Sequence, residues 1–447
     1  MTDEQLQATD IARSTMTKAS WRILPLLGLG YLVAYMDRVN IGFAATRMNQ
    51  DLGFSATIYG LGGGLFFLSY ALFEVPSNLL LVRFGARRWI ARIMITWGIL
   101  AVAMMFVRTP LHFYIVRFLL GFAEAGFFPG VVYYLTRWFP MAERGRALSR
   151  FYVAGPIAAV LLGAISGSLM GLEGHAGLHG WQWLFLVEGS PAIVMGIAIL
   201  FLLPEAPASA AWLTQIEKDW LTGELAADAA KIGEPPSHNI LAALKHPLVL
   251  QLGLLGFLGI GAFYALTLSA PAVLIATTGF DVTHAGYVIS VGGILGAVGM
   301  LYSGALTDRR GDRFGALLIS ILLLAIAYLG LALAKSPVVA IAAYLLFATA
   351  WTTCTTTTVL LWTDALPTRL LAVACAAINS MNQIGAFICP VLWGVSKDKT
   401  GSYSLALIVM SAAMVLMAVL VLILRRQVNR NRADTAARMA AGPAEFA

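Results

Sequence analysis

The chain has 447 residues, of which 59% are hydrophobic and only 12% charged, and its mean hydropathy is +0.79. This composition excludes a soluble enzyme, a nucleic-acid-binding protein and a disordered scaffold. The net charge of +7 comes from basic residues scattered in short clusters between apolar runs, which differs from the single basic stripe of a nucleic-acid-binding surface. We therefore expect a protein that lies in a lipid bilayer and binds no nucleic acid.

Twelve apolar runs are long enough to cross the roughly 30 Å hydrocarbon core as helices. They lie at 21–45, 57–82, 89–107, 111–137, 147–170, 181–203, 246–277, 283–307, 314–334, 337–363, 370–396 and 401–424. We expect an all-α membrane protein with one six-helix bundle over 1–203 and a second bundle, followed by a tail, over 246–447. The polar, proline-containing segment 204–245 is expected to link them.

Basic residues gather on one side of this topology. That side has the clusters that begin at Arg13, Arg83, Arg137 and Lys218, then Arg309 and the C-terminal tail; the other side has only Arg47, Arg108, Lys335, Lys397 and Lys399. The positive-inside rule then places both termini, the linker and the tail in the cytoplasm. A short repeat supports the division into halves, because Arg83-Phe84-Gly85-Ala86-Arg87 and Arg309-Arg310-Gly311-Asp312-Arg313 occupy equivalent loops. Repeated six-helix bundles are typical of transporters, with the substrate site between the bundles near mid-membrane.

The candidate functional residues are the ionisable groups within the predicted spans, since each costs at least about 2.5 to 3.5 kcal/mol at the centre of a membrane helix. The first half has Asp37 and Arg38 in one span, Glu74 in the next, and Arg117 with Glu124 in the fourth. The predicted spans of the second half contain no Asp, Glu, Lys or Arg. Charge-dependent chemistry is therefore expected in the first half.

Arg117 and Glu124 are seven residues apart, which leaves them about 20° from eclipsed on one helix face. If Arg38 points into the same cavity, the two guanidinium groups form a positive site whose natural ligand is a carboxylate. The alternative is internal ion pairing, of Asp37 with either arginine and of Glu124 with either arginine. We favour the binding site because buried ion pairs stabilise less than apolar packing.

The buried carboxyls suggest how a proton could be coupled to the anion. When a substrate carboxylate takes an arginine, the carboxyl that had paired with that arginine loses its partner and binds a proton more readily. Glu124 and Asp37 are therefore candidate proton carriers. Glu74 lies near the cytoplasmic end of its span, where we expect a gating role.

The second half supplies neutral polar groups, namely Asn379, Asn382 and Gln383, whose amides could bond substrate hydroxyls. The threonines within 352–358 are expected to bond back to their own helix. Glycines in the spans at 57–82 and 283–307 indicate close helix packing. His175 and His179 lack a third ligand, so we expect no metal and no cofactor.

Five segments resemble the anion:cation symporter family of the major facilitator superfamily. They are Asp37-Arg38-Val39-Asn40-Ile41; Phe73 to Asn78; Arg117 through Glu124-Ala125-Gly126 to Pro129-Gly130; Phe139-Pro140 with Glu143-Arg144; and Glu188-Gly189-Ser190-Pro191-Ala192. The loop containing Gly304, Asp308, Arg309 and Gly311 resembles the superfamily's loop motif, and the first copy departs from it at Val82. That family includes proton-coupled carriers of sugar acids, tartrate, phthalate and hydroxyphenylacetate.

The resemblance implies a role for individual residues. Asp37 and Glu124 match the protonatable pair, Arg38 and Arg117 match the substrate-anion arginines, and Tyr70 and Asn379 match substrate contacts. We extend the substrate contacts to Asn382 and Gln383, and assign gating to Glu74, Arg83, Asp308 and Arg309. The resemblance also implies the bacterial inner membrane.

We therefore expect a proton-coupled symporter that imports a sugar acid, hydroxy acid or aromatic carboxylate by alternating access. The monomer is expected to be the functional unit. The alternatives are a membrane sensor of extracellular carboxylates and a drug/proton antiporter. No set of nucleophile, base and oxyanion donors is evident, so we do not expect an enzyme.

Overall fold

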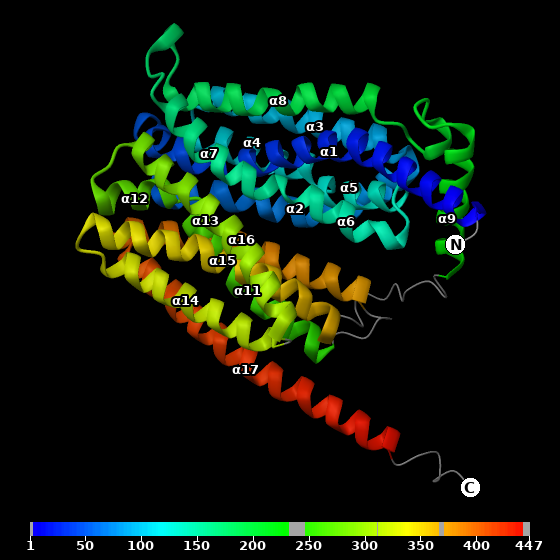
Figure 1. Ribbon diagram of the computed structural model, residues 1–447. Coiled ribbons are helices and arrows are strands. Elements are labelled where there is room, and N and C mark those ends of the chain that lie inside the picture. Colours follow the sequence, from blue (N-terminus) through cyan, green and yellow to red (C-terminus); the bar gives the residue numbers. More distant parts are fainter. Residues whose placement is uncertain (1–2, 232–245, 311, 366–370, 441–447) are drawn as a thin grey trace. The chain divides into compact units, whose positions relative to one another are not determined.

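The computed structural model describes residues 3–231, 246–310, 312–365 and 371–440, and every regular element of these residues is a helix (Figure 1). The α-helices are α1 (Asp3–Asp51), α2 (Ala56–Phe84), α3 (Ala86–Ala103), α4 (Pro110–Glu124), α5 (Phe127–Thr136), α6 (Met141–Tyr152), α7 (Ala154–Met170), α8 (Gly180–Leu202), α9 (Gln215–Lys231), α11 (Pro247–Thr267), α12 (Ala270–Thr278), α13 (Val282–Arg310), α14 (Arg313–Leu333), α15 (Pro337–Ala365), α16 (Leu371–Thr400) and α17 (Ser404–Ala440). Short 3-10 turns lie at Met104–Phe106 (η1), His175–Gly177 (η2) and Pro207–Ser209 (η3). Twelve candidate spans are long and apolar enough to cross a bilayer within the described ranges, which confirms an all-α, multi-pass membrane protein.

Three predicted helices are each interrupted in the structure. The one predicted at 147–170 is divided at Val153 between α6 and α7. The predicted helix at 111–137 consists of α4 and α5, which are separated by Ala125 and Gly126. The predicted helix at 246–277 consists of α11 and α12, and Pro271 lies in the first turn of α12. A proline has no backbone N–H to continue a preceding helix, so a new helix beginning around it is expected. Apolar length alone predicted the crossings correctly but not these breaks.

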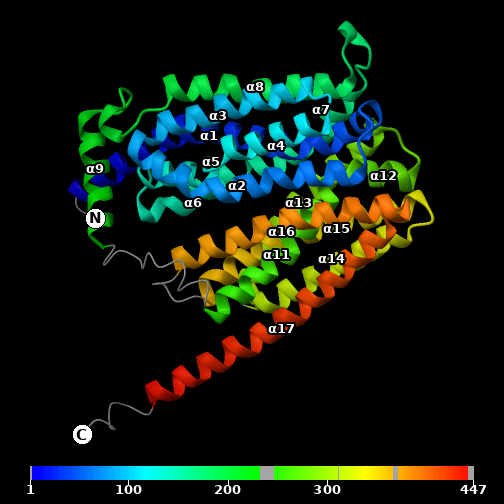
Figure 2. The same cartoon turned by 180° about the vertical axis from the view of Figure 1, so that it is seen from behind.

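The chain forms two compact units, of which one comprises Met1–Pro235 with Thr267–Ile294. In this unit α1 packs against α7 and α8, α3 against α8, and α2 against α4 (Figure 2). Glycines permit the closest approaches: a Cβ placed on Gly121 of α4 would lie 2.1 Å from the carbonyl oxygen of Phe66 on α2. Gly62 likewise faces the ring of Phe113. The expectation that glycines of the span at 57–82 serve helix packing is confirmed for Gly62, whereas Gly121 was not among the glycines named for this role.

The same unit includes α12 and the first part of α13, which contact the helices of the first half through backbone carbonyls. The Tyr59 hydroxyl donates to the Leu268 carbonyl at 2.6 Å, and the Ser290 hydroxyl donates to the Val160 carbonyl at 2.7 Å. A Cβ on Gly163 of α7 would lie 2.2 Å from the Gly286 carbonyl oxygen of α13. A side chain at that position would push α7 and α13 apart.

The second unit comprises Pro236–Leu266 with Leu295–Ala447, and in it α14 packs against α15 and α17. The hydroxyls of Thr353, Thr355, Thr356, Thr357 and Thr358 on α15 each donate to a carbonyl one turn earlier in their own helix. This confirms the expectation for the threonine cluster. These hydroxyls therefore satisfy their hydrogen-bonding needs within α15.

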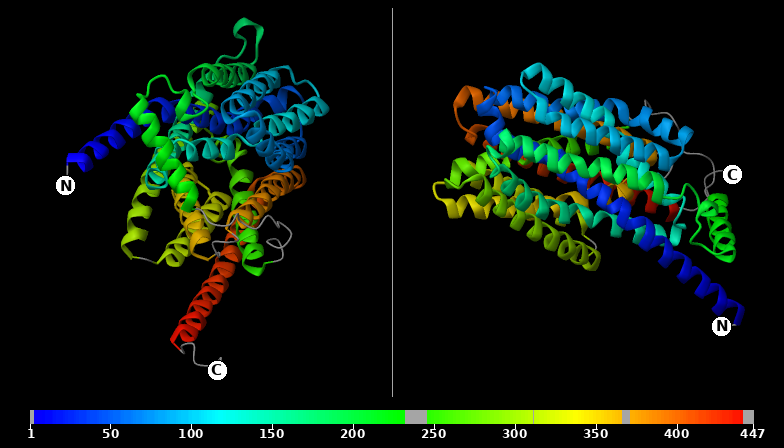
Figure 3. Two further views of the ribbon diagram at one scale, coloured as in Figure 1. Left: turned by 90° about the vertical axis from the view of Figure 1, so that its right-hand side faces the viewer. Right: turned by 90° about the horizontal axis from the view of Figure 1, so that it is seen from above.

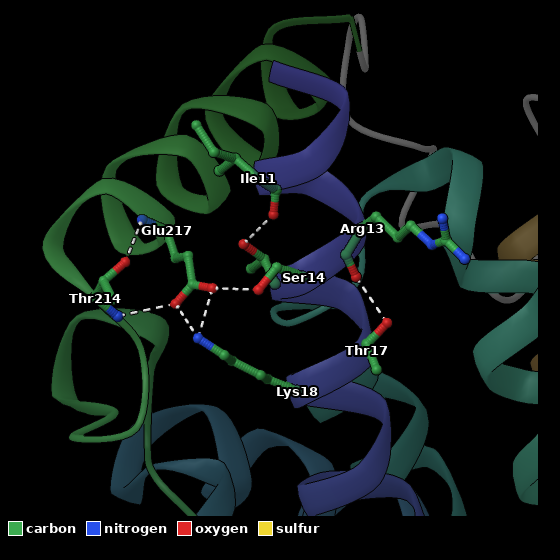
Figure 4. A network of polar contacts seen from close by, with 8 residues as sticks. Ile11, Arg13, Ser14, Thr17, Lys18, Thr214 and Glu217 are labelled. Atoms are coloured by element: carbon green, nitrogen blue, oxygen red, sulfur yellow. Dashed lines mark hydrogen bonds and ion pairs between the residues drawn. The ribbon is translucent and has the colours of Figure 1, made fainter. Parts of the chain in front are cut away.

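The polar end of α1 contacts α9, a helix of the expected linker. Figure 3 shows α1 continuing past its neighbours at its N-terminal end, and Figure 4 shows the contact with α9. Glu217 of α9 accepts bonds from the Lys18 ammonium at 2.7 Å, the Ser14 hydroxyl at 2.8 Å and the Thr214 backbone N–H at 2.9 Å. The two donors from α1, Lys18 and Ser14, tie the linker helix to α1, while the Thr214 N–H fixes the carboxylate from within the linker.

Candidate functional site

The break between α4 and α5 places Glu124 at the very end of a membrane helix. Gly126 adopts φ +88°, a left-handed conformation that favours glycine, and a Cβ there would lie 2.5 Å from the Ser77 hydroxyl. The Ala125 N–H still bonds to the Gly121 carbonyl, so the turn of α4 that precedes the break is closed. Discontinuous helices with polar groups at the break are typical of substrate sites in transporters.

Glu124 is fully buried and forms an ion pair with Arg38 of α1. The two residues are 86 positions apart in the chain, and their contact joins α1 to the end of α4. The Arg38 side chain is 23% exposed, whereas the Glu124 side chain is inaccessible. The pair therefore has a buried anionic member and a cationic member that a solute can reach.

Phe66 of α2 lies beside both arginines. Its ring centroid is 5.6 Å from the Arg38 guanidinium carbon and 4.9 Å from that of Arg117, and Tyr70 lies 5.3 Å from Arg38. A guanidinium near an aromatic face is attracted by the ring quadrupole. The predicted residues Arg38, Arg117 and Tyr70 are thus brought together around one ring, which the sequence analysis had not singled out.

Arg117 is only 1% exposed and bonds to the backbone of α2. Its Nε donates to the Gly62 carbonyl at 3.3 Å and its Nη2 to the Gly63 carbonyl at 3.4 Å. Within the described part of the chain it forms no ion pair with a carboxylate. Of the internal pairings considered from the sequence, the structure contains Glu124 with Arg38. Arg117 instead bonds to carbonyls and lies beside a ring, and Asp37 and Glu124 act on it electrostatically without forming an ion pair with it.

Asp37 is buried in the same unit but bonds to different partners. The Trp97 indole N–H of α3 donates to it at 2.7 Å, and the Asn40 amide donates at 3.4 Å. Glu124 and Arg117 act on it electrostatically, so the two predicted proton carriers interact. Asp37 is 2% exposed, and protons can reach it only through these polar contacts or through a change of conformation.

Glu188 is a buried carboxyl in the family-like segment 188–192, and no role was predicted for it. It lies in α8, is 4% exposed, and accepts a bond from the Ser166 hydroxyl at 2.6 Å. The signal for it was present, since it is an acidic residue inside the span predicted at 181–203. The candidate membrane spans of the first unit therefore hold three buried carboxyls, Asp37, Glu124 and Glu188, rather than the two expected.

The expected gating residues are placed less completely. Glu74 is half-buried on α2, and Arg83 is exposed near the end of that helix with its guanidinium 5.7 Å from the Phe84 ring. Asp308 and Arg309 lie in α13, but their side chains are outside the described residues. Their gating roles stay predictions.

The amides expected in the second half lie on α16. Asn382 and Gln383 are each 7% exposed, and Asn379 is half-buried. Asn382 packs closely against α11, because its Oδ1 would lie 1.8 Å from a Cβ placed on Gly256. All three remain predicted substrate contacts.

The arrangement allows Arg38 to exchange one carboxylate partner, that of Glu124, for the carboxylate of a bound solute. Arg38 holds Glu124 now and could hold an incoming anion instead, while Arg117 supplies a second fixed positive charge. Among the described residues no group of three or more metal-binding side chains is placed to hold a metal ion.

Comparison with known proteins agrees with this architecture. Residues 27–390 match the Major Facilitator Superfamily. A putative tartrate transporter of Agrobacterium vitis is 41% identical over 95% of this chain and 94% of its own length. A quinolone resistance transporter of Acinetobacter baumannii is 38% identical over 95% of this chain and 98% of its length. The putative metabolite transport protein NicT of Pseudomonas putida is 39% identical over 94% of this chain and 96% of its length.

Solved structures share the fold at low sequence identity. A bacterial homologue of the human lysosomal transporter Spinster, in an inward-facing and unoccupied conformation, has a TM-score of 0.75 at 18% identity, covering 92% of this chain and 98% of the other. The nucleoside transporter NupG has a TM-score of 0.67 at 13% identity, with 91% and 98% covered. The chain thus belongs to the major facilitator superfamily, in a branch with anion:cation symporter-like relatives, and is a transport protein rather than an enzyme.

Proposed function

We propose that this chain is a proton-coupled symporter that imports a small organic anion by alternating access. The substrate is a sugar acid, a hydroxy acid or an aromatic carboxylate. Two relatives at 41% and 40% identity are named as tartrate transporters, which supports a carboxylate substrate. The positive-inside distribution supports a cytoplasmic location for both termini. The bacterial relatives support an inner-membrane location, and we take the monomer as the working unit.

The ion pair of Arg38 with the buried Glu124 carries this proposal. A substrate carboxylate that binds Arg38 displaces Glu124, and an unpaired carboxylate in an apolar interior is costly. Glu124 then binds a proton, so anion and proton enter the same state of the carrier. Release of the anion restores the ion pair and expels the proton.

The remaining residues have supporting roles in this proposal. Arg117 adds positive charge beside Arg38, Tyr70 and Phe66 hold the planar guanidinium groups, and Asp37 is the second protonatable group. The amides on α16 bind the non-carboxylate end of the substrate. Glu74, Arg83, Asp308 and Arg309 control opening on the cytoplasmic side.

The binding step is tested with purified protein and a panel of tartrate, sugar acids, aromatic carboxylates and a quinolone. A ligand that prefers the folded state raises the unfolding temperature. Arg38→Ala should abolish the stabilisation that the parent shows with the best carboxylate. Arg47→Ala, on the exposed outer end of the same helix, is the control and should respond like the parent. Parent-like stabilisation in Arg38→Ala would remove this arginine from the binding site.

The coupling step is tested in proteoliposomes with the carboxylate that stabilises the parent. Glu124→Gln imitates the protonated acid permanently, so it should still exchange substrate across the membrane but lose accumulation driven by an inward proton gradient. Glu143→Gln, which removes a surface carboxylate paired with Arg146, should accumulate like the parent. Accumulation by Glu124→Gln at the parent's level would contradict its role as the proton carrier.

A drug/proton antiporter is the second candidate, because a quinolone resistance transporter is 38% identical. The two functions predict opposite directions of coupled flux: an inward proton gradient drives carboxylate inward in a symporter and a drug outward in an antiporter. Quinolone binding together with gradient-driven export would favour the antiporter. A membrane sensor would show carboxylate binding without exchange.

A further inference from the structure

Glu188 is the buried acid that the proposed coupling mechanism does not use. One carboxyl oxygen, Oε1, accepts a bond from Ser166 of α7 at 2.6 Å. The other, Oε2, is buried and has no hydrogen-bond partner among the described residues. A carboxylate normally satisfies both oxygens, so an unpartnered one calls for an explanation.

The helices around Glu188 supply no compensating positive charge. α8 packs against α1, α3, α7 and η1, and neither α7 nor η1 contains a charged residue. The arginines of α3, at 87, 88 and 92, lie within its first seven residues. On α1 the charged group next to Glu188 is Asp37, which is acidic, and Arg38 is paired with Glu124. An ionised Glu188 would be an isolated buried charge, which folded proteins avoid by keeping the group neutral.

Asn40 connects this acid to Asp37. The Asn40 side chain is fully buried, donates to the Asp37 Oδ1 at 3.4 Å, and is also hydrogen-bonded to the Glu188 side chain. The Asn40 Oδ1, like the Glu188 Oε2, is a buried oxygen without a donor in the described part of the structure. A proton on Glu188 removes the unpaired charge from this group of buried oxygens and supplies a hydroxyl donor that the ionised acid lacks.

We propose that Glu188 remains protonated throughout the transport cycle and, through Asn40, positions Asp37 for reversible protonation. This inference rests on the proton coupling proposed above. A permanently neutral acid fixes the orientation of the Asn40 amide without adding a second negative charge beside Asp37. Glu188 is thus a positioning residue, whereas Glu124 and Asp37 exchange protons.

The protonation state is tested without any transport. Infrared spectra of the purified parent should contain the carbonyl band of a buried protonated carboxylic acid, and this band should persist in alkaline buffer. Glu188→Gln should lack it, whereas Asn40→Leu, which keeps the acid, should retain a band at a shifted frequency. Identical parent and Glu188→Gln spectra would show that Glu188 is ionised and would overturn the inference.

The positioning role is tested by the pH dependence of gradient-driven uptake in proteoliposomes. Glu188→Gln keeps a neutral side chain of the same shape, so its profile should match the parent's. Asn40→Leu removes a donor to ionised Asp37 and should move the midpoint upward by about half to one pH unit, the effect of one lost hydrogen bond. Glu188→Ala, if it folds, should shift the midpoint in the same direction.

Three other outcomes are decisive. Loss of accumulation in Glu188→Gln with exchange preserved would make Glu188 a mobile proton carrier and contradict its permanent protonation. An unshifted profile in Asn40→Leu would contradict the positioning role. If uptake by the parent itself does not depend on protons, the proposed function fails, while the infrared comparison still decides the protonation state of Glu188.

Discussion

Arg38 and Arg117 carry the same charge in surroundings that give them different tasks. Arg38 is partly exposed and engages a carboxylate that it can release, whereas Arg117 is buried and bonds to the backbone of α2. Hydrogen bonds from a cation to neutral carbonyls hold the cation in place but do not cancel its positive charge. The substrate carboxylate is therefore expected to meet Arg38 first and to be stabilised by Arg117.

Lysine substitutions should separate these tasks. Arg117→Lys retains the charge but loses the planar fork that reaches both Gly62 and Gly63, so it should unfold at a lower temperature, with a loss on the order of 1 to 3 kcal/mol. Arg38→Lys should unfold near the parent's temperature and bind carboxylate more weakly. Thermal unfolding with and without the carboxylate measures both effects. Equal unfolding temperatures for the two variants would contradict the division of roles.

The end of α4 shows how an element positions a residue. Gly126 turns the chain through a left-handed conformation immediately after Glu124, and the absent Cβ lets α2 approach at Ser77. A continuous helix from 110 to 136 would carry Glu124 in mid-helix with its carbonyl bonded to the next turn. The break instead leaves a helix end beside the Arg38 guanidinium.

Gly126→Ala should therefore lower the free energy of unfolding by more than an alanine substitution at an uncrowded glycine with positive φ. Gly53 is the matched control: its φ is +66°, and a Cβ added there would meet no other atom within 4 Å. Gly53→Ala should lower the free energy of unfolding only by the cost of placing an alanine in a left-handed backbone conformation, about 1 to 2 kcal/mol. Gly126→Ala should lose more, because the new methyl group meets the Ser77 hydroxyl, and exchange of substrate should fall with it. Equal unfolding free energies would show that contact with α2 is unimportant.

The contact of α9 with α1 predicts a pH dependence outside the membrane. Burial raises the pKa of Glu217, but bonds from Lys18, the Thr214 N–H and Ser14 outweigh it and lower the pKa to about 2. A carboxyl whose pKa is lowered in the folded state stabilises that state above its ordinary pKa near 4.5, and the stabilisation is lost as the pH falls towards 2. The contact should thus be complete at neutral pH.

Hydrogen exchange of α9 amides checks this prediction. At neutral pH, Glu217→Gln should exchange faster than the parent, because a neutral amide cannot replace the ion pair with Lys18. The difference should shrink as the pH approaches 2, where the parent's carboxyl is protonated. Glu224→Gln, at an exposed position of the same helix, is the control and should match the parent. Unchanged exchange at neutral pH in Glu217→Gln would show that this network does not hold α9.

Across the whole molecule, the features that follow from local sequence were predicted and those that depend on distant contacts were not. Apolar length fixes a membrane crossing, so the spans were predictable. The partner of Glu124 was not, because Arg38 lies 86 residues away and Arg117 was an equally charged choice on the same helix. The burial of Arg117 depends on close approach of α2 and α4 at glycines, which no single segment specifies.

The two halves of the chain differ in the chemistry they offer, and this predicts different mutational signatures. Buried charge in the described spans is concentrated in the first half, while α16 offers the amides of Asn379, Asn382 and Gln383. A charge attracts every carboxylate, whereas an amide bonds only to a substrate with a suitably placed hydroxyl or ring substituent. Arg38→Ala should consequently weaken all carboxylates alike.

Asn379→Ala should instead change the ranking among carboxylates and leave the proton dependence of uptake unaltered. Substrates with a hydroxyl that bonds to this amide should lose about tenfold in affinity, as expected for one lost hydrogen bond of about 1.4 kcal/mol, and those without it should lose little. Competition by each carboxylate against uptake of one labelled substrate measures the ranking. Ser380→Ala, at the adjacent position of α16, is the control, since its hydroxyl bonds to its own helix at the Ala376 carbonyl. If Asn379→Ala weakens every substrate equally, the residue supports packing, and selectivity must come from other groups.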